Sequence, residues 1–190
     1  MPQLPTAVLV IDAQQSFQRR PYWHGTDAPA FFNHMQMLVD GARAQNLPVV
    51  QVFHFEAEGA FSLASGYVKT LDELSIAPDA VFHKHRHGAS VGSGLLVWLT
   101  ERGICRLIIS GIRTEQCCET TTRHASDCGY SVDFVTAATL TFPMSDRHGH
   151  RWSTEDIKAR TGLVLDGRFA RICSVEQALI GAAASQPAGG

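Results

Sequence analysis

Three kinds of reactive side chain stand at the ends of short apolar runs in this sequence. Asp12 follows the run AVLVI, Lys84 closes the run AVFHK, and the adjacent Cys117 and Cys118 come shortly after RLIISG. A carboxylate, an ammonium group and a thiol that meet in one place can transfer a proton, balance charge and attack a carbonyl carbon. Each type also has an ordinary role, since an aspartate can cap a turn, a lysine is usually solvated, and a cysteine can pack like a small apolar residue.

The cysteine pair falls in the stretch SGIRTEQCCETTTRHASDCGY, which has the pattern of a turn followed by a helix. Gly111 allows a tight turn, Thr114 is the predicted N-cap, and Gly129 is a natural end of the helix. Cys117 is then the third residue of the helix, where unpaired N–H groups and the helix dipole favour a thiolate and lower the pKa of a thiol. Cys118 lies about 100° further round the helix. It could pack instead, and periodicity alone does not decide which cysteine faces the strand ends.

The apolar runs that carry these residues belong to a pattern in which strand-length and helix-length segments alternate. The strand-like runs are rich in β-branched residues and nearly all apolar, as in parallel strands covered on both faces. We therefore predict an α/β fold, a three-layer α/β/α sandwich around a six-stranded, mainly parallel sheet with right-handed crossovers. The predicted strands are residues 7–12, 48–55, 80–84, 106–110, 131–137 and 169–175, and the predicted helices are residues 29–46, 93–103, 114–129, 153–167 and 175–185.

The strand ends are where such a fold would place a site. Ligands of open α/β sheets bind at the carboxyl ends of the strands, so Asp12, Lys84 and the cysteine pair are expected to share one edge. Two long connections, residues 56–79 and 139–152, also follow strands and contain Gly, Ser or Pro. Connections of this length are often lids or binding loops, and an ordinary surface insertion is the alternative.

Composition narrows the classes of function. The 190 residues, 45% of them hydrophobic, fit one domain, predicted at residues 1–182, and the small, Pro/Gly-rich residues 183–190 are predicted to form a flexible tail. A formal net charge of −2 and scattered Lys and Arg argue against nucleic acid as a partner. The apolar run that ends at Asp12 is too short for a signal sequence or a membrane span. Five cysteines, an odd number, favour a reducing compartment, so we expect a cytoplasmic protein with no membrane partner.

Three blocks of the sequence together resemble the isochorismatase-like cysteine hydrolases, the superfamily of nicotinamidase and N-carbamoylsarcosine amidase. The blocks are AVLVIDAQQSF, KHRHGASVGSGL and SGIRTEQCCETTTRHASDCGYSVDFV, and they appear in the family's order. The third block is the most specific, because it follows the family pattern G-x-x-T-x-x-C-x-x-T. The resemblance implies that Asp12, Lys84 and Cys117 form a catalytic triad with Cys117 as its nucleophile, while Cys118 takes the place of a small apolar residue.

The resemblance carries further expectations about the chemistry. It implies a cis peptide bond between Ile112 and Arg113, which aims the backbone N–H groups of Arg113 and Cys117 at one point, an oxyanion hole. The implied reaction is cleavage of an amide or ureide C–N bond of a small-molecule substrate through a thioester, without a cofactor. Two alternatives stay open, namely an isochorismatase-type vinyl ether hydrolase that does not rely on the cysteine, and a non-catalytic scaffold with the same fold. Relatives of this kind assemble as dimers, tetramers or larger, so a homo-oligomer is expected.

The sequence departs from nicotinamidases at the end of the second predicted strand, where they carry Asp-x-His and a later His as metal ligands. The segment VFHFEAEGAF has His54 but neither the preceding aspartate nor a second histidine nearby, so no metal site is predicted and nicotinamide becomes a less favoured substrate. The histidines at 83, 85, 87, 148 and 150 lack a recognisable metal spacing.

Residues near the strand ends or in the expected loops are candidates for a small, apolar-walled substrate pocket. These candidates are Phe17, Trp23, Phe53, Phe55 and Phe142. Three arginines, Arg20, Arg86 and Arg113, could bind a carboxylate group of a substrate in a bidentate manner.

Overall fold

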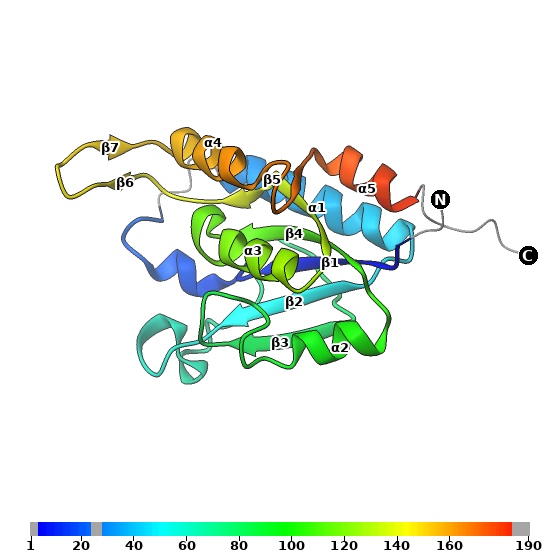
Figure 1. The fold of residues 1–190 in the computed structure, drawn as a ribbon. Coiled ribbons are helices and arrows are strands. Elements are labelled where there is room, and N and C mark those ends of the chain that lie inside the picture. The colour runs from blue at the N-terminus through cyan, green and yellow to red at the C-terminus, as the bar shows by residue number, and fades with distance from the viewer. Residues whose placement is uncertain (1–3, 24–27, 184–190) are drawn as a thin grey trace, which may run out of the picture.

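The computed structural model describes residues 4–23 and 28–183, and its centre is a six-stranded sheet in which every pair of neighbours is parallel (Figure 1). The strands are β1 (Thr6–Ile11), β2 (Val49–His54), β3 (Ala80–Lys84), β4 (Arg106–Ile112), β5 (Ser131–Leu140) and β8 (Arg171–Ile172), in the order β3-β2-β1-β4-β5-β8. The predicted six-stranded parallel sheet is confirmed. The predicted tail, apart from its first residue, lies outside the described residues.

Helices cover both faces of the sheet, which gives the predicted three layers. One face packs against α1 (Ala28–Ala44) and α5 (Val175–Ala183), and the other packs against α2 (Leu95–Glu101), α3 (Glu119–Asp127) and α4 (Thr154–Leu165). Strand alternation divides the core accordingly, because Val8 and Val10 face the first group while Leu9 and Ile11 face the second. Within the described residues, no helix is both long and apolar enough to span a bilayer.

The helical period of α1 explains its place. Its buried side chains recur at the spacing of one helix face, as the sequence predicts. They are Phe31, Met35, Leu38, Val39 and Ala42. At α4 the start is set by a capping box, in which the Ser153 hydroxyl accepts from the N–H of Asp156 and the Asp156 carboxylate accepts from the N–H of Ser153.

The connection predicted as an irregular loop at residues 139–152 has a different structure. Strand β5 continues to Leu140, and the chain then forms an antiparallel hairpin of β6 (Met144–Ser145) and β7 (Arg151–Trp152), which projects from the body of the molecule in Figure 1. The Asp146 carboxylate accepts hydrogen bonds from the backbone N–H groups of His148 and His150, which closes the turn locally. The hairpin therefore forms from local polar contacts that hydrophobic patterning does not register.

The other long connection, residues 56–79, holds two short 3-10 helices, η2 (Gly59–Phe61) and η3 (Leu63–Ser65). Its later part is tied to the residues that follow β1. The N–H of Gln15 donates to the carbonyl of Lys69 at 2.9 Å, and the N–H of Ser16 donates to the carbonyl of Tyr67 at 3.0 Å. This segment is thus anchored beside the carboxyl end of β1, and its action as a lid stays a prediction.

Gly111 lies inside β4 rather than in a turn after it, so the predicted turn role is wrong. It pairs with Ile11 of β1 in the sheet register and has a φ of +132°. A Cβ at this position would lie 1.9 Å from the carbonyl oxygen of Ile11. Only glycine allows this close approach of β1 and β4, and the approach brings the residue after β1 next to the segment after β4.

Candidate active site

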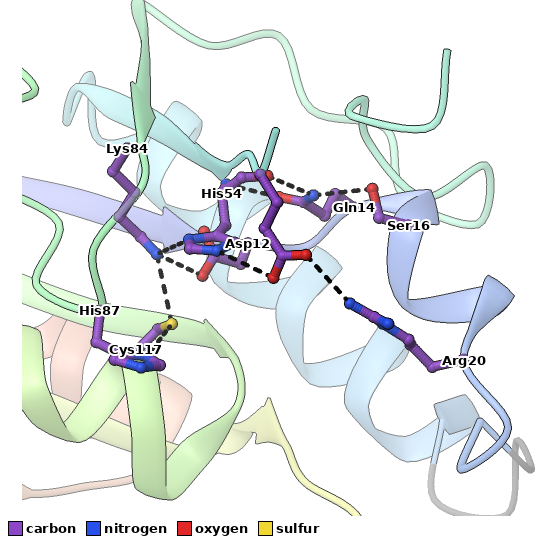
Figure 2. Close-up of polar contacts among 9 residues, drawn as sticks. Asp12, Gln14, Ser16, Arg20, His54, Lys84, His87 and Cys117 are labelled. Carbon is purple, nitrogen blue, oxygen red and sulfur yellow. Dashed lines mark hydrogen bonds and ion pairs between the residues drawn. The ribbon is translucent and has the colours of Figure 1, made fainter. Parts of the chain in front are cut away.

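The structure brings the three predicted catalytic residues together in a buried position (Figure 2). The Lys84 Nζ atom donates to Asp12 Oδ2 at 2.7 Å and to Cys117 Sγ at 3.4 Å. The Lys84 and Asp12 side chains are both 0% exposed. The strand order explains why a long side chain is needed at position 84. Strand β2 lies between β3 and β1, so Lys84 must reach across two strand spacings of about 4.8 Å each to meet Asp12. The lysine stem spans that distance under cover of the protein.

Asp12 has an unusual backbone conformation for a residue other than glycine. Its φ is +52°, in the left-handed region, which aspartate tolerates better than most residues. Its N–H donates to the carbonyl of Val52 at 2.7 Å, and its own carbonyl accepts from the N–H of Gln14 at 2.8 Å. These two bonds turn the chain sharply after β1 and hold the carboxylate at the edge of the sheet.

The two carboxylate oxygens of Asp12 have different partners. Oδ2 accepts from Lys84, whereas Oδ1 is buried and has no nitrogen or oxygen donor at hydrogen-bonding distance among the described residues. The negative charge of this carboxylate acts on the nearby Cys117 thiol and raises its pKa. Asp12 is therefore placed to accept the proton of that thiol.

Cys117 lies in a π-helical turn, η4 (Thr114–Cys118), which leads directly into α3. The carbonyl of Arg113 accepts from the N–H groups of Gln116 and Cys118, each at 3.2 Å, on either side of the Cys117 amide. Arg113, not Thr114, stands at the cap position, and the Thr114 hydroxyl instead donates to Thr139 Oγ1 at 2.8 Å. The predicted N-cap is therefore wrong by one residue, because the β5 partner captures the hydroxyl.

The pKa of the Cys117 thiol contradicts the expectation drawn from its helix position. Burial raises the pKa, the negative charge of Asp12 raises it further, and the positive charge of Lys84 opposes both only in part. For Lys84, burial alone would lower the pKa, but the charge of Asp12 and the hydrogen bonds outweigh burial and raise it. The resting site thus holds a neutral thiol beside an ammonium group, and burial outweighs the helix terminus.

Two predictions about the surroundings of Cys117 are confirmed. Cys118 is 0% exposed and packs in the apolar core on the α3 side of the sheet, so its prediction as a packing residue is confirmed. The peptide bond between Ile112 and Arg113 is cis, as the resemblance implies. The Arg113 guanidinium pairs with the carboxylate of Glu115 at 3.1 Å.

Two histidines that were not predicted as site residues complete the group. His54 Nδ1 lies 3.4 Å from Lys84 Nζ, and His87 Nδ1 lies 3.6 Å from Cys117 Sγ. The two imidazole rings are nearly parallel, with an interplanar angle of 12° and centroids 6.5 Å apart. Burial, and then the charge of Lys84, lower the pKa of His54. Because an ammonium group only donates, Nδ1 of a neutral His54 accepts and its hydrogen lies on Nε2.

Gln14 fixes the backbone of His54. Its side-chain Nε2 donates to the His54 carbonyl at 2.9 Å and to Ser16 Oγ at 3.0 Å, while its Oε1 accepts from the His54 N–H at 2.8 Å (Figure 2). One buried amide therefore joins the turn after β1 to the end of β2. The sequence offered a signal for His54, since it ends a strand at the same edge as Asp12 and Lys84.

The predicted pocket residues fall into separate aromatic groups. Phe17 packs edge-on against Phe61, and Phe142 packs against Trp23 at 5.6 Å between centroids. Both Phe53 and Phe55 have ring contacts with His83. Their contact with a substrate stays a prediction.

Two of the predicted carboxylate-binding arginines already have carboxylate partners. Arg113 pairs with Glu115, and Arg20 lies 3.4 Å from Glu56. A substrate carboxylate would have to compete with these side chains.

The metal ligands of nicotinamidases are not matched at the end of β2. Val52 stands two residues before His54, where those enzymes have an aspartate. Within residues 4–23 and 28–183, no three His, Cys, Asp or Glu side chains are grouped so that they could hold one metal ion. The residues present therefore do not fit the nicotinamidase type of metal centre.

Fold and site together define a hydrolase with a three-layer α/β/α architecture. A model of the isochorismatase domain matches residues 6–169, and the chain belongs to the isochorismatase family. Nicotinamidase 3 of Arabidopsis thaliana is 28% identical over 152 residues, which are 72% of this chain and 73% of that protein.

Solved structures agree with this assignment. A structure described as an isochorismatase from Burkholderia xenovorans has a TM-score of 0.87 at 28% identity, and the match covers 98% of this chain and 91% of that one. A hydrolase of the isochorismatase family from Chromobacterium violaceum has a TM-score of 0.85 at 27% identity, over 95% of this chain and 94% of that one.

Proposed function

We propose that this protein is a cysteine-dependent hydrolase that cleaves the C–N bond of a small amide or ureide through a thioester on Cys117. The observation that carries the proposal is the buried contact of Lys84 with both Asp12 and Cys117, at 2.7 and 3.4 Å. This contact brings a candidate nucleophile, Cys117, a candidate base, Asp12, and the positive charge of Lys84 together away from solvent. The similarity to Nicotinamidase 3 supports an amide as the substrate class.

The first half of the reaction would proceed by attack of sulfur on the carbonyl carbon. Asp12 takes the thiol proton as the C–S bond forms, which avoids a free thiolate in a site that raises the pKa of Cys117. The N–H groups of Arg113 and Cys117 bind the oxyanion, and each donor of this kind contributes about 2.7 to 4 kcal/mol. Asp12 then gives the proton to the leaving nitrogen, the C–N bond breaks, and the thioester remains for water to hydrolyse.

Lys84 has an electrostatic and a positional role in this scheme. During attack, negative charge develops on sulfur and on the carbonyl oxygen while Asp12 is close by. Little water reaches the buried site, so this charge is only weakly screened. The ammonium group offsets this charge and holds Asp12 and Cys117 at fixed positions through its two hydrogen bonds. Cofactor chemistry has no part in the scheme.

Ammonia release from a panel of small amides and ureides tests the proposal. The native chain, Cys117→Ala and Cys118→Ala are compared, so that the adjacent cysteine serves as the matched control. We expect activity to be lost in Cys117→Ala and to persist in Cys118→Ala. Turnover that survives in Cys117→Ala would discard the thiol mechanism and favour the ether hydrolase, which a vinyl ether substrate run alongside would reveal.

A further inference from the structure

The Lys84 ammonium group has a third partner besides the two side chains of the proposed mechanism. Its Nζ atom lies 2.7 Å from Asp12 Oδ2 and 3.4 Å from Cys117 Sγ, and it also lies 3.4 Å from Nδ1 of His54, the last residue of β2. Figure 2 shows these three partners around Nζ. An ammonium group has three hydrogens and no acceptor, so the three contacts can engage every one of them.

The His54 ring is itself held in place. Gln14 binds both the N–H and the carbonyl of its backbone, at 2.8 and 2.9 Å. Beyond the ring, Glu56 Oε1 lies 3.7 Å from Nε2, and Glu56 Oε2 lies 3.4 Å from Arg20. A carboxylate beside Nε2 favours a hydrogen on that atom, which leaves Nδ1 as the acceptor that faces Lys84.

Sulfur is the weakest of the three acceptors, and this gives the third contact its importance. A carboxylate oxygen binds an ammonium hydrogen more strongly than a thiol sulfur does. With Asp12 and Cys117 as its only partners, the ammonium group could rotate about its bond to Asp12, and a buried hydrogen without an acceptor is costly. An acceptor at His54 takes up this hydrogen and thereby fixes the direction of the one that points at sulfur.

We propose that His54 is a positioning residue that acts through Lys84, by holding its ammonium group in the orientation that directs one hydrogen at Cys117 Sγ. Its part in turnover rests on the proposed function, whereas its effect on the thiol is a property of the site alone. Protonation of His54 would replace the acceptor with a second cation 3.4 Å from Nζ. The arrangement therefore requires a neutral imidazole.

The charged and titratable groups around the imidazole determine the pH range in which it is neutral. Burial and the charge of Lys84 lower the pKa of His54, and Asp12 opposes this shift. The groups that face the ring come from every neighbouring segment, and they are Asp12 after β1, Glu56 after β2 with its partner Arg20, Lys84 of β3, and His85 and His87 in the loop after β3. His54 is thus neutral at pH 7 and gains its proton below its ordinary pKa of 6.5.

The test measures the rate at which iodoacetamide alkylates Cys117, with peptide mapping to separate this cysteine from the other four. His54→Asn places an amide oxygen near the position of Nδ1 but cannot take up a proton, while His54→Leu removes the acceptor. The bonds from Gln14 go to the backbone, so both variants can keep them. The control is His85→Leu, which removes an exposed histidine of the same region. Urea unfolding measures the folded fraction of each protein.

We expect alkylation of Cys117 at pH 7 to be about 10- to 100-fold slower in His54→Leu and within about threefold of native in His54→Asn and His85→Leu. Below pH 6.5 the native rate should fall more steeply than the rate of His54→Asn. Because His85 and His87 titrate in both proteins, this difference belongs to residue 54. In ammonia release from the most active amide of the panel, His54→Leu should lower kcat with KM close to native, since His54 acts on Lys84 and not on the substrate.

Each contrary result overturns a definite statement. Alkylation of folded His54→Leu within about threefold of native, or an equal loss in His54→Asn, overturns the role of His54 as the acceptor. An equal fall below pH 6.5 in native and His54→Asn also overturns it, and this comparison decides alone where His54→Leu does not fold. A raised KM with unchanged kcat makes His54 a substrate-binding residue instead. Absence of ammonia release in the native chain overturns the proposed function only, because the alkylation rates still test the contact of His54 with Lys84.

Discussion

Removal of the buried ammonium group is expected to destabilise the fold strongly, and Lys84→Met is the variant that isolates this effect. At the 2.7 Å separation of Nζ and Asp12 Oδ2, an effective dielectric constant of 20 gives an attraction of about 6 kcal/mol. Desolvation of the two ions offsets part of this attraction. The variant leaves Asp12 buried without its partner, and loss of one member of such a pair costs about 3 to 5 kcal/mol.

Urea unfolding at pH 7 measures this cost, and the double variant Asp12→Asn with Lys84→Met serves as its control. The double variant removes both charges, so it should regain much of the stability lost in Lys84→Met. Asp12→Asn alone completes the cycle. Two results would refute the interpretation of Asp12 and Lys84 as a tightly coupled buried ion pair. One is a loss of unfolding free energy below about 1 kcal/mol in Lys84→Met, and the other is a double variant no more stable than Lys84→Met.

Three further predictions concern other parts of the structure. Gly111→Ala should lower the free energy of unfolding by several kcal/mol, because its Cβ would lie 1.9 Å from the carbonyl oxygen of Ile11. The control is Gly129→Ala, which has a φ of +88° but no atom within 4 Å of the added Cβ, and it should cost about 1 to 2 kcal/mol. Equal losses in the two variants would contradict the close approach of β1 and β4. The pKa of His54, followed by NMR, should lie below 6.5 because burial and Lys84 lower it. As pH falls below 6.5, the unfolded chain then takes up this proton before the folded chain does, so His54 makes the fold less stable on acidification. A folded-state midpoint of 6.5 would remove this contribution, and a midpoint above 6.5 would reverse its sign. Ser153→Ala should cost about 1 kcal/mol in thermal or urea unfolding by removing the N-cap of α4, and an unchanged stability would show the cap to be dispensable.

The strands β1, β2 and β4 were largely predictable, because their burial on both faces leaves a nearly continuous apolar signal. The edge strand β3 has the predicted bounds, Ala80–Lys84, and the four central strands differ from their predicted bounds by a few residues at their ends. The last strand is much shorter than predicted. Its register with β5 covers only Arg171 and Ile172, at the sheet edge, and the N–H of Cys173 adds one bond to the carbonyl of Phe134 at 3.2 Å. The apolar Val175 is buried as the first residue of α5 and not as part of a strand. Apolar patterning indicates burial, and it does not separate the end of a strand from the buried start of the next helix.

The site was predictable where strand ends determine it and unpredictable where local geometry does. Asp12 and Lys84 could be placed on one edge by the rule for parallel sheets. Hydrophobic patterning does not register the π turn at Cys117, and the capture of the Thr114 hydroxyl by Thr139 depends on the contact between η4 and β5. His87 lies three residues beyond its strand, and only the folded course of its loop brings it to the sulfur.

The central claim is that Cys117 carries the acyl group during turnover, and acid quenching of the reaction tests it most directly. The native chain is mixed with the most active amide of the panel, quenched within the turnover time, digested and mapped by mass spectrometry, with Cys118→Ala in parallel to separate the adjacent cysteines. We predict an acyl adduct on Cys117 in both proteins. An adduct on Cys118, or ammonia release with no adduct on either cysteine and unchanged turnover in Cys117→Ala, would contradict the claim.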